Sequence, residues 1–120
     1  ETLSLYAEVI KKEMSENKLY RNPSLTLPML AEKIGTTTHV VSQVINSAFN
    51  QNFYNFVNSY RVDEVKSVLE KSETEITNIL KEAYAAGFNS KTTFNTIFKK
   101  TTGMTPTEFR KKIESEKDRT

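Results

Sequence analysis

The amino-acid sequence predicts an all-α protein of about seven helices, in which two similar halves are joined by a long linker helix. Apolar residues recur at spacings of three and four along most of the 120-residue chain. A helix-ending pattern occurs twice, because Ala31 and Gly35 match Ala83 and Gly87 at an offset of 52 residues. Between the two copies, residues 53–71 contain neither proline nor glycine, as a long helix requires.

The composition is that of an ordinary globular protein, with 27% charged and 37% hydrophobic residues. No apolar run approaches the length of a membrane span, and no signal peptide is visible. Zero cysteines exclude disulfides and thiolate metal sites, and one histidine leaves little for zinc, so we expect no metal and no cofactor. Because the chain begins at Glu1, we expect it to be a piece of a longer protein.

The first predicted part, residues 1–51, contains an N-terminal helix and a pair of shorter helices. The N-terminal helix is amphipathic over its first fifteen or so residues, and Asn22 and Pro23 break it. Thr26 caps the second helix, which Gly35 ends. A third helix over about residues 38–48 buries an inner face formed by Val41, Val44, Ile45 and Ala48.

The second predicted part, residues 52–72, is the linker helix. Within it, a helix over residues 53–71 spans about 27 Å, at 1.5 Å per residue. Its apolar and aromatic stripe is expected to pack each half onto the linker and so to fix their separation. The stripe consists of Phe53, Phe56, Val57, Tyr60, Val65, Val68 and Leu69.

The third predicted part, residues 73–120, repeats the helix pair. The inner face of its first helix is expected to be Ile76, Ile79, Leu80, Ala83 and Tyr84. The inner face of its second helix, over about residues 91–101, is expected to be Phe94, Ile97, Phe98 and Thr101. After Gly103, a further helix starts with a capping box and a proline at its first position, formed by Thr105, Pro106 and Glu108. Residues 114–120 are expected to fray.

The positive charge is concentrated in one segment. The net charge is only +2, but residues 91–112 contain six basic residues and one acidic residue. Residues 1–90 contain nine basic and eleven acidic residues. The second helix pair and the helix after it are therefore the expected place for phosphate groups, although a lysine-rich solvated face would give the same pattern.

A short helix pair with a polar outer face and a glycine at the turn is the outline of a helix-turn-helix. The run GFNSKTTFNTIFKKTTGMTPTEFR, residues 87–110, resembles the C-terminal signature of the AraC/XylS family of bacterial transcription regulators. The resemblance extends from about Thr26 to Ile113. It departs at Asn50, where the family commonly has glycine and where we expect a left-handed backbone, and at Gln43, where arginine is frequent.

The resemblance implies two helix-turn-helix subdomains that place the second helix of each in adjacent major grooves of double-stranded DNA. Such helices lie about 34 Å apart on one side of B-DNA, so a rigid linker has a geometric purpose. The implied readers of base edges are His39, Ser42, Gln43, Asn46, Lys91, Thr92, Asn95 and Thr96. The expected phosphate contacts flank these faces and are Thr37, Thr38, Lys99 and Lys100.

Two other functions compete with sequence-specific DNA binding. A helical protein-interaction module that has lost DNA recognition would suit the modest net charge. An enzyme is a poor reading, because His39 is the only histidine and no acid, base and nucleophile set can be assembled. We expect a cytoplasmic protein, no small-molecule site in this fragment, and RNA polymerase as a candidate partner. Dimerisation, a membrane tether outside this chain, and activator or repressor action stay open.

Overall fold

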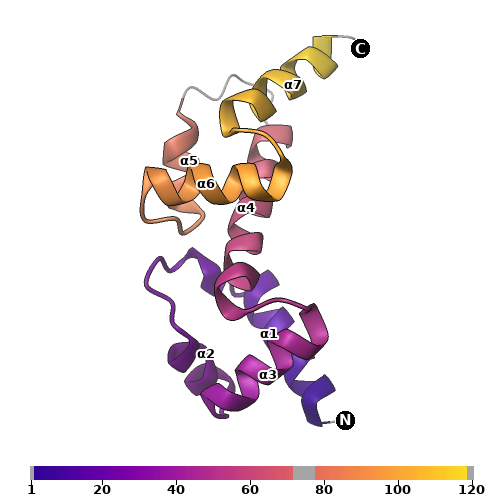
Figure 1. Cartoon of the computed structure of the whole chain (residues 1–120), viewed down its shortest axis with the longest axis vertical. Coiled ribbons are helices and arrows are strands. Elements are labelled where there is room, and N and C mark those ends of the chain that lie inside the picture. Colours follow the sequence, from indigo (N-terminus) through magenta and orange to yellow (C-terminus); the bar gives the residue numbers. More distant parts are fainter. Residues whose placement is uncertain (1, 72–77, 119–120) are drawn as a thin grey trace. The chain divides into compact units, whose positions relative to one another are not determined.

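The computed structural model describes residues 2–71 and 78–118, and these residues contain helices and no strand (Figure 1). The all-α prediction with two helix-turn-helix pairs is confirmed. In chain order, the elements are α1 (Thr2–Ser15), a short 3-10 helix η1 (Leu19–Arg21), α2 (Leu27–Ile34), α3 (Thr38–Phe49), α4 (Phe53–Lys71), α5 (Ile79–Ala85), α6 (Lys91–Thr102) and α7 (Pro106–Asp118).

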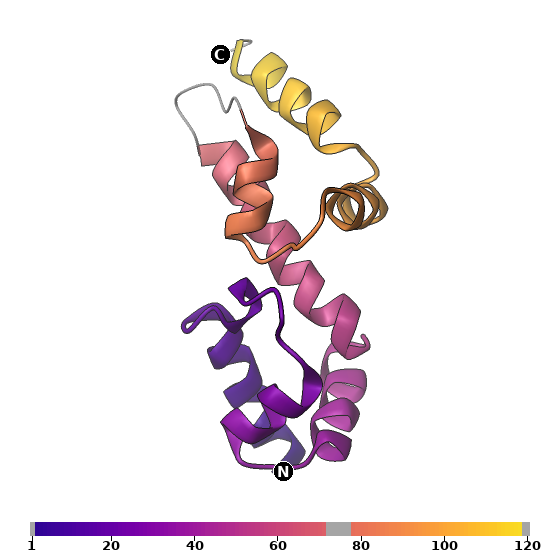
Figure 2. The same cartoon turned by 90° about the vertical axis from the view of Figure 1, so that its left-hand side faces the viewer.

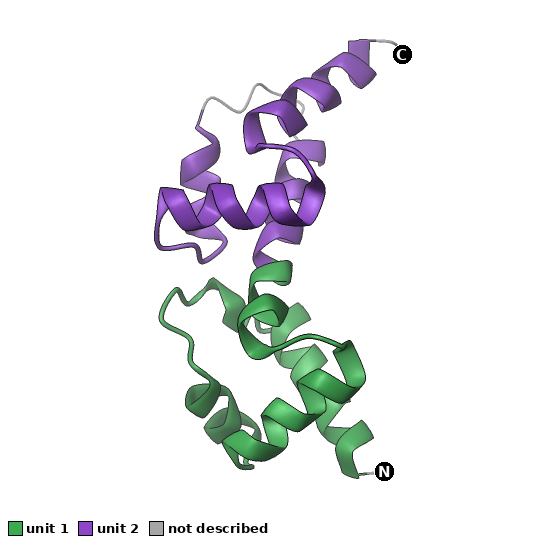
Figure 3. Cartoon of the chain, viewed as in Figure 1, with its two compact units in different colours: residues 1–60 green, residues 61–120 purple. Residues whose placement is uncertain are grey.

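The chain forms two compact units, residues 1–60 and 61–120, which we call unit 1 and unit 2 (Figure 3). The boundary falls inside α4, so the first part of the linker helix belongs to unit 1 and the remainder to unit 2. Each unit has its own hydrophobic core, which means that each helix pair is held by its own set of buried side chains.

In unit 1, α1 and α2 both pack against α3. Aromatic rings join the start of α4 to this core, because Phe56 stacks on Phe49 at 4.7 Å between ring centroids and meets Tyr60 edge-on at 5.3 Å. The buried core consists of Ile10, Met14, Tyr20, Leu30, Ala31, Val41, Val44, Ile45, Phe56 and Val57.

In unit 2, the second part of α4 contributes buried side chains to the core. Seen from the side in Figure 2, α6 points almost along the line of sight and crosses α5 at a steep angle. A chain of four phenylalanine rings, Phe88, Phe94, Phe98 and Phe109, runs through the core with centroid distances of 5.2, 5.6 and 5.4 Å. The remaining buried side chains are Val62, Val65, Leu69, Ala83 and Ala86.

The repeat extends to the ends of the helices. Helices α3 and α6 have 12 residues each, and their N-caps, Thr37 and Ser90, each accept a hydrogen bond from the backbone N–H three residues later. Both helices end at a residue with a left-handed backbone, Asn50 with φ 53° and Gly103 with φ 81°. The expected left-handed geometry of Asn50 is therefore confirmed.

One predicted core residue in each of α3 and α6 is exposed, and the two occupy the same position of the repeat. Ala48 and Thr101 both face solvent, whereas the next residues, Phe49 and Thr102, are half-buried. The inward-facing residues of each helix thus follow a spacing of four, as Val41, Ile45 and Phe49 in α3 and as Phe94, Phe98 and Thr102 in α6. Side chains at this spacing form the ridge that helices commonly use when they pack.

Other differences concern residues 76–118. Tyr84 was expected in the core but is 48% exposed, and Glu32, at the matching position of unit 1, is also exposed. Residues 114–118 continue α7 instead of fraying. Ile76 lies outside the described residues. Val62, which was left out of the predicted stripe, is fully buried.

The predicted capping box at the start of α7 is confirmed. The Thr105 N–H donates to Glu108 Oε1 at 2.8 Å, and the Glu108 N–H donates to Thr105 Oγ1 at 3.1 Å. The hydrogen bond from the Thr105 backbone is the main cause that lowers the pKa of the Glu108 carboxyl, ahead of the Thr105 hydroxyl and the charges of Lys99 and Lys111.

This pKa shift gives α7 a measurable acid dependence. Because the carboxylate is favoured in the folded state, its contribution to the free energy of unfolding is complete above the ordinary pKa of 4.5 and is lost as pH falls through the lower folded pKa. We expect NMR titration to place the Glu108 pKa below 4.5. The stability difference between the wild type and Glu108→Gln should shrink in the same pH range. A Glu108 carboxyl that titrates at or above its ordinary value would contradict the assignment.

Candidate nucleic-acid interface

The outer face of α3 is exposed, polar and without formal charge. Its side chains come from a helix whose opposite face is buried through Val41, Val44 and Ile45. Since these three side chains fix the rotation of the helix, the residues between them must point outward. Thr38, His39, Gln43 and Asn46 are exposed, and Ser42 is half-buried at the edge of the face.

Two polar groups on this face already have partners in the protein. Asn46 Nδ2 donates to the Ser42 carbonyl oxygen at 3.0 Å, one helical turn earlier. Thr37 Oγ1 accepts the Val40 N–H at 3.2 Å as the helix cap. A capping hydroxyl keeps its own hydrogen to donate, so Thr37 can still contact a phosphate. The Asn46 amide has one of its donors occupied and is less suited to reading a base pair.

The outer face of α6 occupies the equivalent position in the repeat but is positively charged. Phe94 and Phe98 are 2% and 0% exposed and direct the opposite side of the helix to solvent. That side begins with Lys91 and ends with Lys99 and Lys100, all exposed. Between them lie Thr92, Asn95 and Thr96, which are also exposed.

The predicted site residues therefore form two sets, one on each unit. His39, Ser42, Gln43 and Asn46 share the face of α3, with Thr37 and Thr38 at its start. The face of α6 gathers the six residues predicted for unit 2. Thr101, which was predicted on the inner face, is instead exposed next to Lys100 and adds a hydroxyl to the end of this face. The repeat could not have identified it, because the matching residue, Ala48, was also predicted on the inner face and is likewise exposed.

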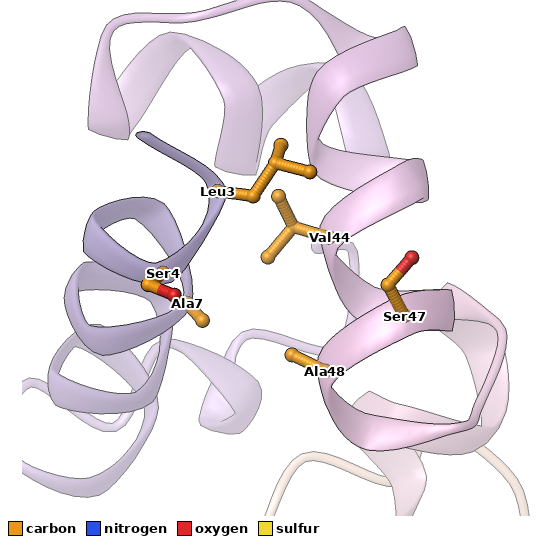
Figure 4. A pocket seen from close by; sticks show the side chains of 6 residues that line it. All are labelled: Leu3, Ser4, Ala7, Val44, Ser47 and Ala48. Carbon is orange, nitrogen blue, oxygen red and sulfur yellow. The ribbon is translucent and has the colours of Figure 1, made fainter. Parts of the chain in front are cut away.

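Helices α1 and α3 border a pocket of about 230 Å³ in unit 1 (Figure 4). It is lined by Leu3, Ser4 and Ala7 of α1 and by Val44, Ser47 and Ala48 of α3. Pockets that bind drug-sized ligands usually enclose about 300–1,000 Å³, so this one is small. Among the residues that the structure describes, no cluster of side chains could hold a metal ion, and no described helix is long and apolar enough to cross a bilayer.

The chain is similar to known transcription regulators in sequence. Residues 30–112 match the family described as helix-turn-helix domain. An uncharacterised HTH-type transcriptional regulator from Pseudoalteromonas carrageenovora is 30% identical over 101 residues, which are 83% of this chain and 56% of that protein. A second one, from Staphylococcus aureus, is 29% identical over 93 residues, which are 78% of this chain and 12% of that protein. The chain thus spans about half of one relative and a small part of the other.

Solved structures agree with this match. The C-terminal domain of the two-component response regulator yesN from Fusobacterium nucleatum is 25% identical, with a TM-score of 0.71 over 86% of this chain and 95% of that one. An AraC-type transcriptional regulator from Chromobacterium violaceum, 16% identical, has the same fold, with a TM-score of 0.68 over 89% of this chain and 96% of that one. The chain therefore belongs to the helix-turn-helix domain family, and within it to the AraC-type DNA-binding domains of bacterial transcription regulators.

Proposed function

We propose that this chain binds double-stranded DNA sequence-specifically by placing α3 and α6 in adjacent major grooves. The observation that carries the proposal is the pair of exposed polar faces at equivalent positions of the repeat. Each face lies on a helix of 12 residues whose other side is buried in a core of its own, so its rotation is fixed. A major groove accepts one such helix and presents a distinct pattern of donors and acceptors at each base pair.

The side chains fall into two roles. We assign base contacts to His39, Ser42, Gln43 and Asn46 on α3 and to Lys91, Thr92, Asn95 and Thr96 on α6, because they lie on the outward side of a helix or, for Ser42, at its edge. Asn46 would contribute through its Oδ1 and second N–H, since one N–H already donates to the Ser42 carbonyl oxygen. We assign phosphate contacts to Thr37, Thr38, Lys99 and Lys100, which lie at the ends of these faces. In this proposal, the first DNA-reading part is residues 1–51 and the second is residues 73–120. The linker between them is residues 52–72.

The proposed binding to DNA also suggests where the protein acts and which proteins it meets. A chain that acts on promoter DNA in a bacterium works in the cytoplasm, and RNA polymerase is the protein that it would meet there. Any dimerisation would involve regions outside this chain. We propose no catalytic role, since the sequence offers no cysteine and only one histidine as nucleophile or base.

Selection of a preferred duplex from random DNA, followed by anisotropy titration, tests the proposal. We expect a preferred site to emerge, and we expect Gln43→Ala, Lys91→Ala and Asn95→Ala each to weaken it by about 1–3 kcal/mol while leaving non-specific binding unchanged. Equal losses on every sequence would reassign these residues as phosphate contacts. Failure to bind any duplex, together with capture of a protein partner, would favour the interaction module.

A further inference from the structure

One long stretch of unit 1 contains no formal charge. Residues 34–60 include no Asp, Glu, Lys or Arg, although such residues make up 27% of the chain. The stretch covers the turn after α2, the whole of α3 and the first part of α4. The matching stretch of unit 2, residues 87–113, contains six basic residues and one acidic residue. The two halves of the repeat therefore share a fold, but this stretch is uncharged in unit 1 and basic in unit 2.

The cations of unit 1 lie outside the uncharged stretch. They are on α1, between α1 and η1, on η1 and at the end of α2, and their number is matched by five acidic residues. Lys33 is the basic residue of the last turn of α2 and therefore the cation nearest to α3 in sequence. In unit 2, by contrast, Lys91, Lys99 and Lys100 are exposed on the proposed reading helix itself.

The uncharged face of α3 offers one side chain that is well suited to identify a base. Gln43 is exposed, and among the described residues no hydrogen bond engages its amide. Asn46 has its Nδ2 group on the Ser42 carbonyl oxygen. A free carboxamide can donate to N7 and accept from N6 of adenine, whereas guanine is usually read by arginine or lysine, which α3 lacks.

We infer that the two units divide the work of recognition, an inference that rests on the proposed DNA binding. Besides making its own base contacts, unit 2 anchors the protein through Lys99 and Lys100, whose contacts release counterions from the phosphate backbone. Unit 1 contributes sequence discrimination through uncharged groups, with Gln43 reading an adenine in an A·T-containing half-site. The affinity of the whole chain then depends on salt through unit 2 and on base sequence in the α3 half-site through unit 1.

The salt dependence of binding distinguishes the two contributions. For B-DNA, the logarithm of the affinity falls with the logarithm of salt concentration with a slope of about −0.9 for each phosphate that a cation neutralises. Lys99→Gln with Lys100→Gln should therefore make the slope shallower by about 1.8 on every duplex. Gln43→Ala should leave the slope unchanged and weaken the preferred site by about 10- to 100-fold.

Three further measurements complete the test on the full chain. Lys33→Gln removes the cation of unit 1 that is nearest to α3 in sequence. It should leave the slope unchanged, because in this inference no cation of unit 1 neutralises a phosphate. Ser47→Ala is the matched control for Gln43→Ala. Ser47 lies on the same helix but lines the pocket beside α1 and is not a proposed DNA contact (Figure 4). Replacing the adenine opposite Gln43 should weaken the wild type but not Gln43→Ala, as a direct contact requires.

The outcomes separate this inference from the proposed function. If Lys33→Gln changes the slope as much as one of the α6 lysines, or if Gln43→Ala binds the preferred site like the wild type, the division of labour is wrong although the chain still binds DNA. If the wild type binds no duplex at low salt, the proposed function itself fails. A slope that only the α6 lysines change, with sequence preference that only Gln43→Ala changes in the α3 half-site, supports the inference.

Discussion

Replacing Phe98 with alanine is expected to destabilise unit 2 by about 3–5 kcal/mol, the usual cost of removing a buried aromatic ring. Phe98 is 0% exposed and lies in the middle of the ring chain, 5.6 Å from Phe94 and 5.4 Å from Phe109. Its loss leaves a cavity between α6 and α7 and removes the support that fixes the rotation of α6. Since small domains are stable by only about 5–15 kcal/mol, unit 2 should lose much of its stability.

Amide hydrogen exchange measures this effect by residue. In Phe98→Ala, protection should fall for α5, α6 and α7, whereas α1, α2 and α3 belong to a separate core and should keep theirs. Phe56→Ala is the matched variant for unit 1, because Phe56 is 2% exposed and contacts Phe49 and Tyr60. A loss below about 1 kcal/mol in Phe98→Ala would show that the ring chain does not support α6.

Helix ends were the features that the sequence predicted best. Thr26, Gly35, Gly103 and the box at Thr105 all act as caps in the structure. These signals are local, because a cap depends on the backbone geometry of one residue and on hydrogen bonds within one turn. The repeat added the long-range information, since it required the same arrangement twice.

Side-chain orientation near the ends of the short helices was predicted less well. Thr101 was assigned to the core, but Thr102 is the half-buried residue. Its hydroxyl donates to the Phe98 carbonyl oxygen at 2.8 Å and accepts the Met104 N–H at 3.1 Å, so it holds the turn before α7. Apolar periodicity does not register such a polar role.

Residue type alone could not predict which proposed base-contacting side chains are already hydrogen-bonded within the protein. Asn46 and Gln43 carry the same functional group, and both are exposed on α3. The Asn46 side chain is short enough to bond the carbonyl one turn earlier, at 3.0 Å, whereas the longer Gln43 side chain is left available. Burial of polar residues was not predicted either. Asn58 and Arg61 are only 2% and 9% exposed, although Asn and Arg side chains are mostly exposed in proteins.

Placing a carboxylate in the middle of the α6 face, by Asn95→Glu, is expected to weaken binding to every duplex by at least about 100-fold, which is close to 3 kcal/mol. Asn95 is exposed, one turn from Lys91 and one turn from Lys99. A negative charge there faces the phosphate-lined groove and also offsets the two neighbouring lysines. Anisotropy titration on preferred and random DNA at low salt measures the loss.

The same substitution should leave the fold intact, which separates a binding defect from unfolding. A glutamate four residues before a lysine stabilises a helix by about 0.2–0.5 kcal/mol, so the thermal midpoint of Asn95→Glu should equal or slightly exceed that of the wild type. Asn95→Gln keeps an amide on the face without the charge and should retain non-specific binding. Ser115→Glu adds the same charge at an exposed site of α7 and should bind nearly as the wild type does. Equal losses in Asn95→Glu and Ser115→Glu would mean that net charge governs affinity and that α6 does not enter the groove.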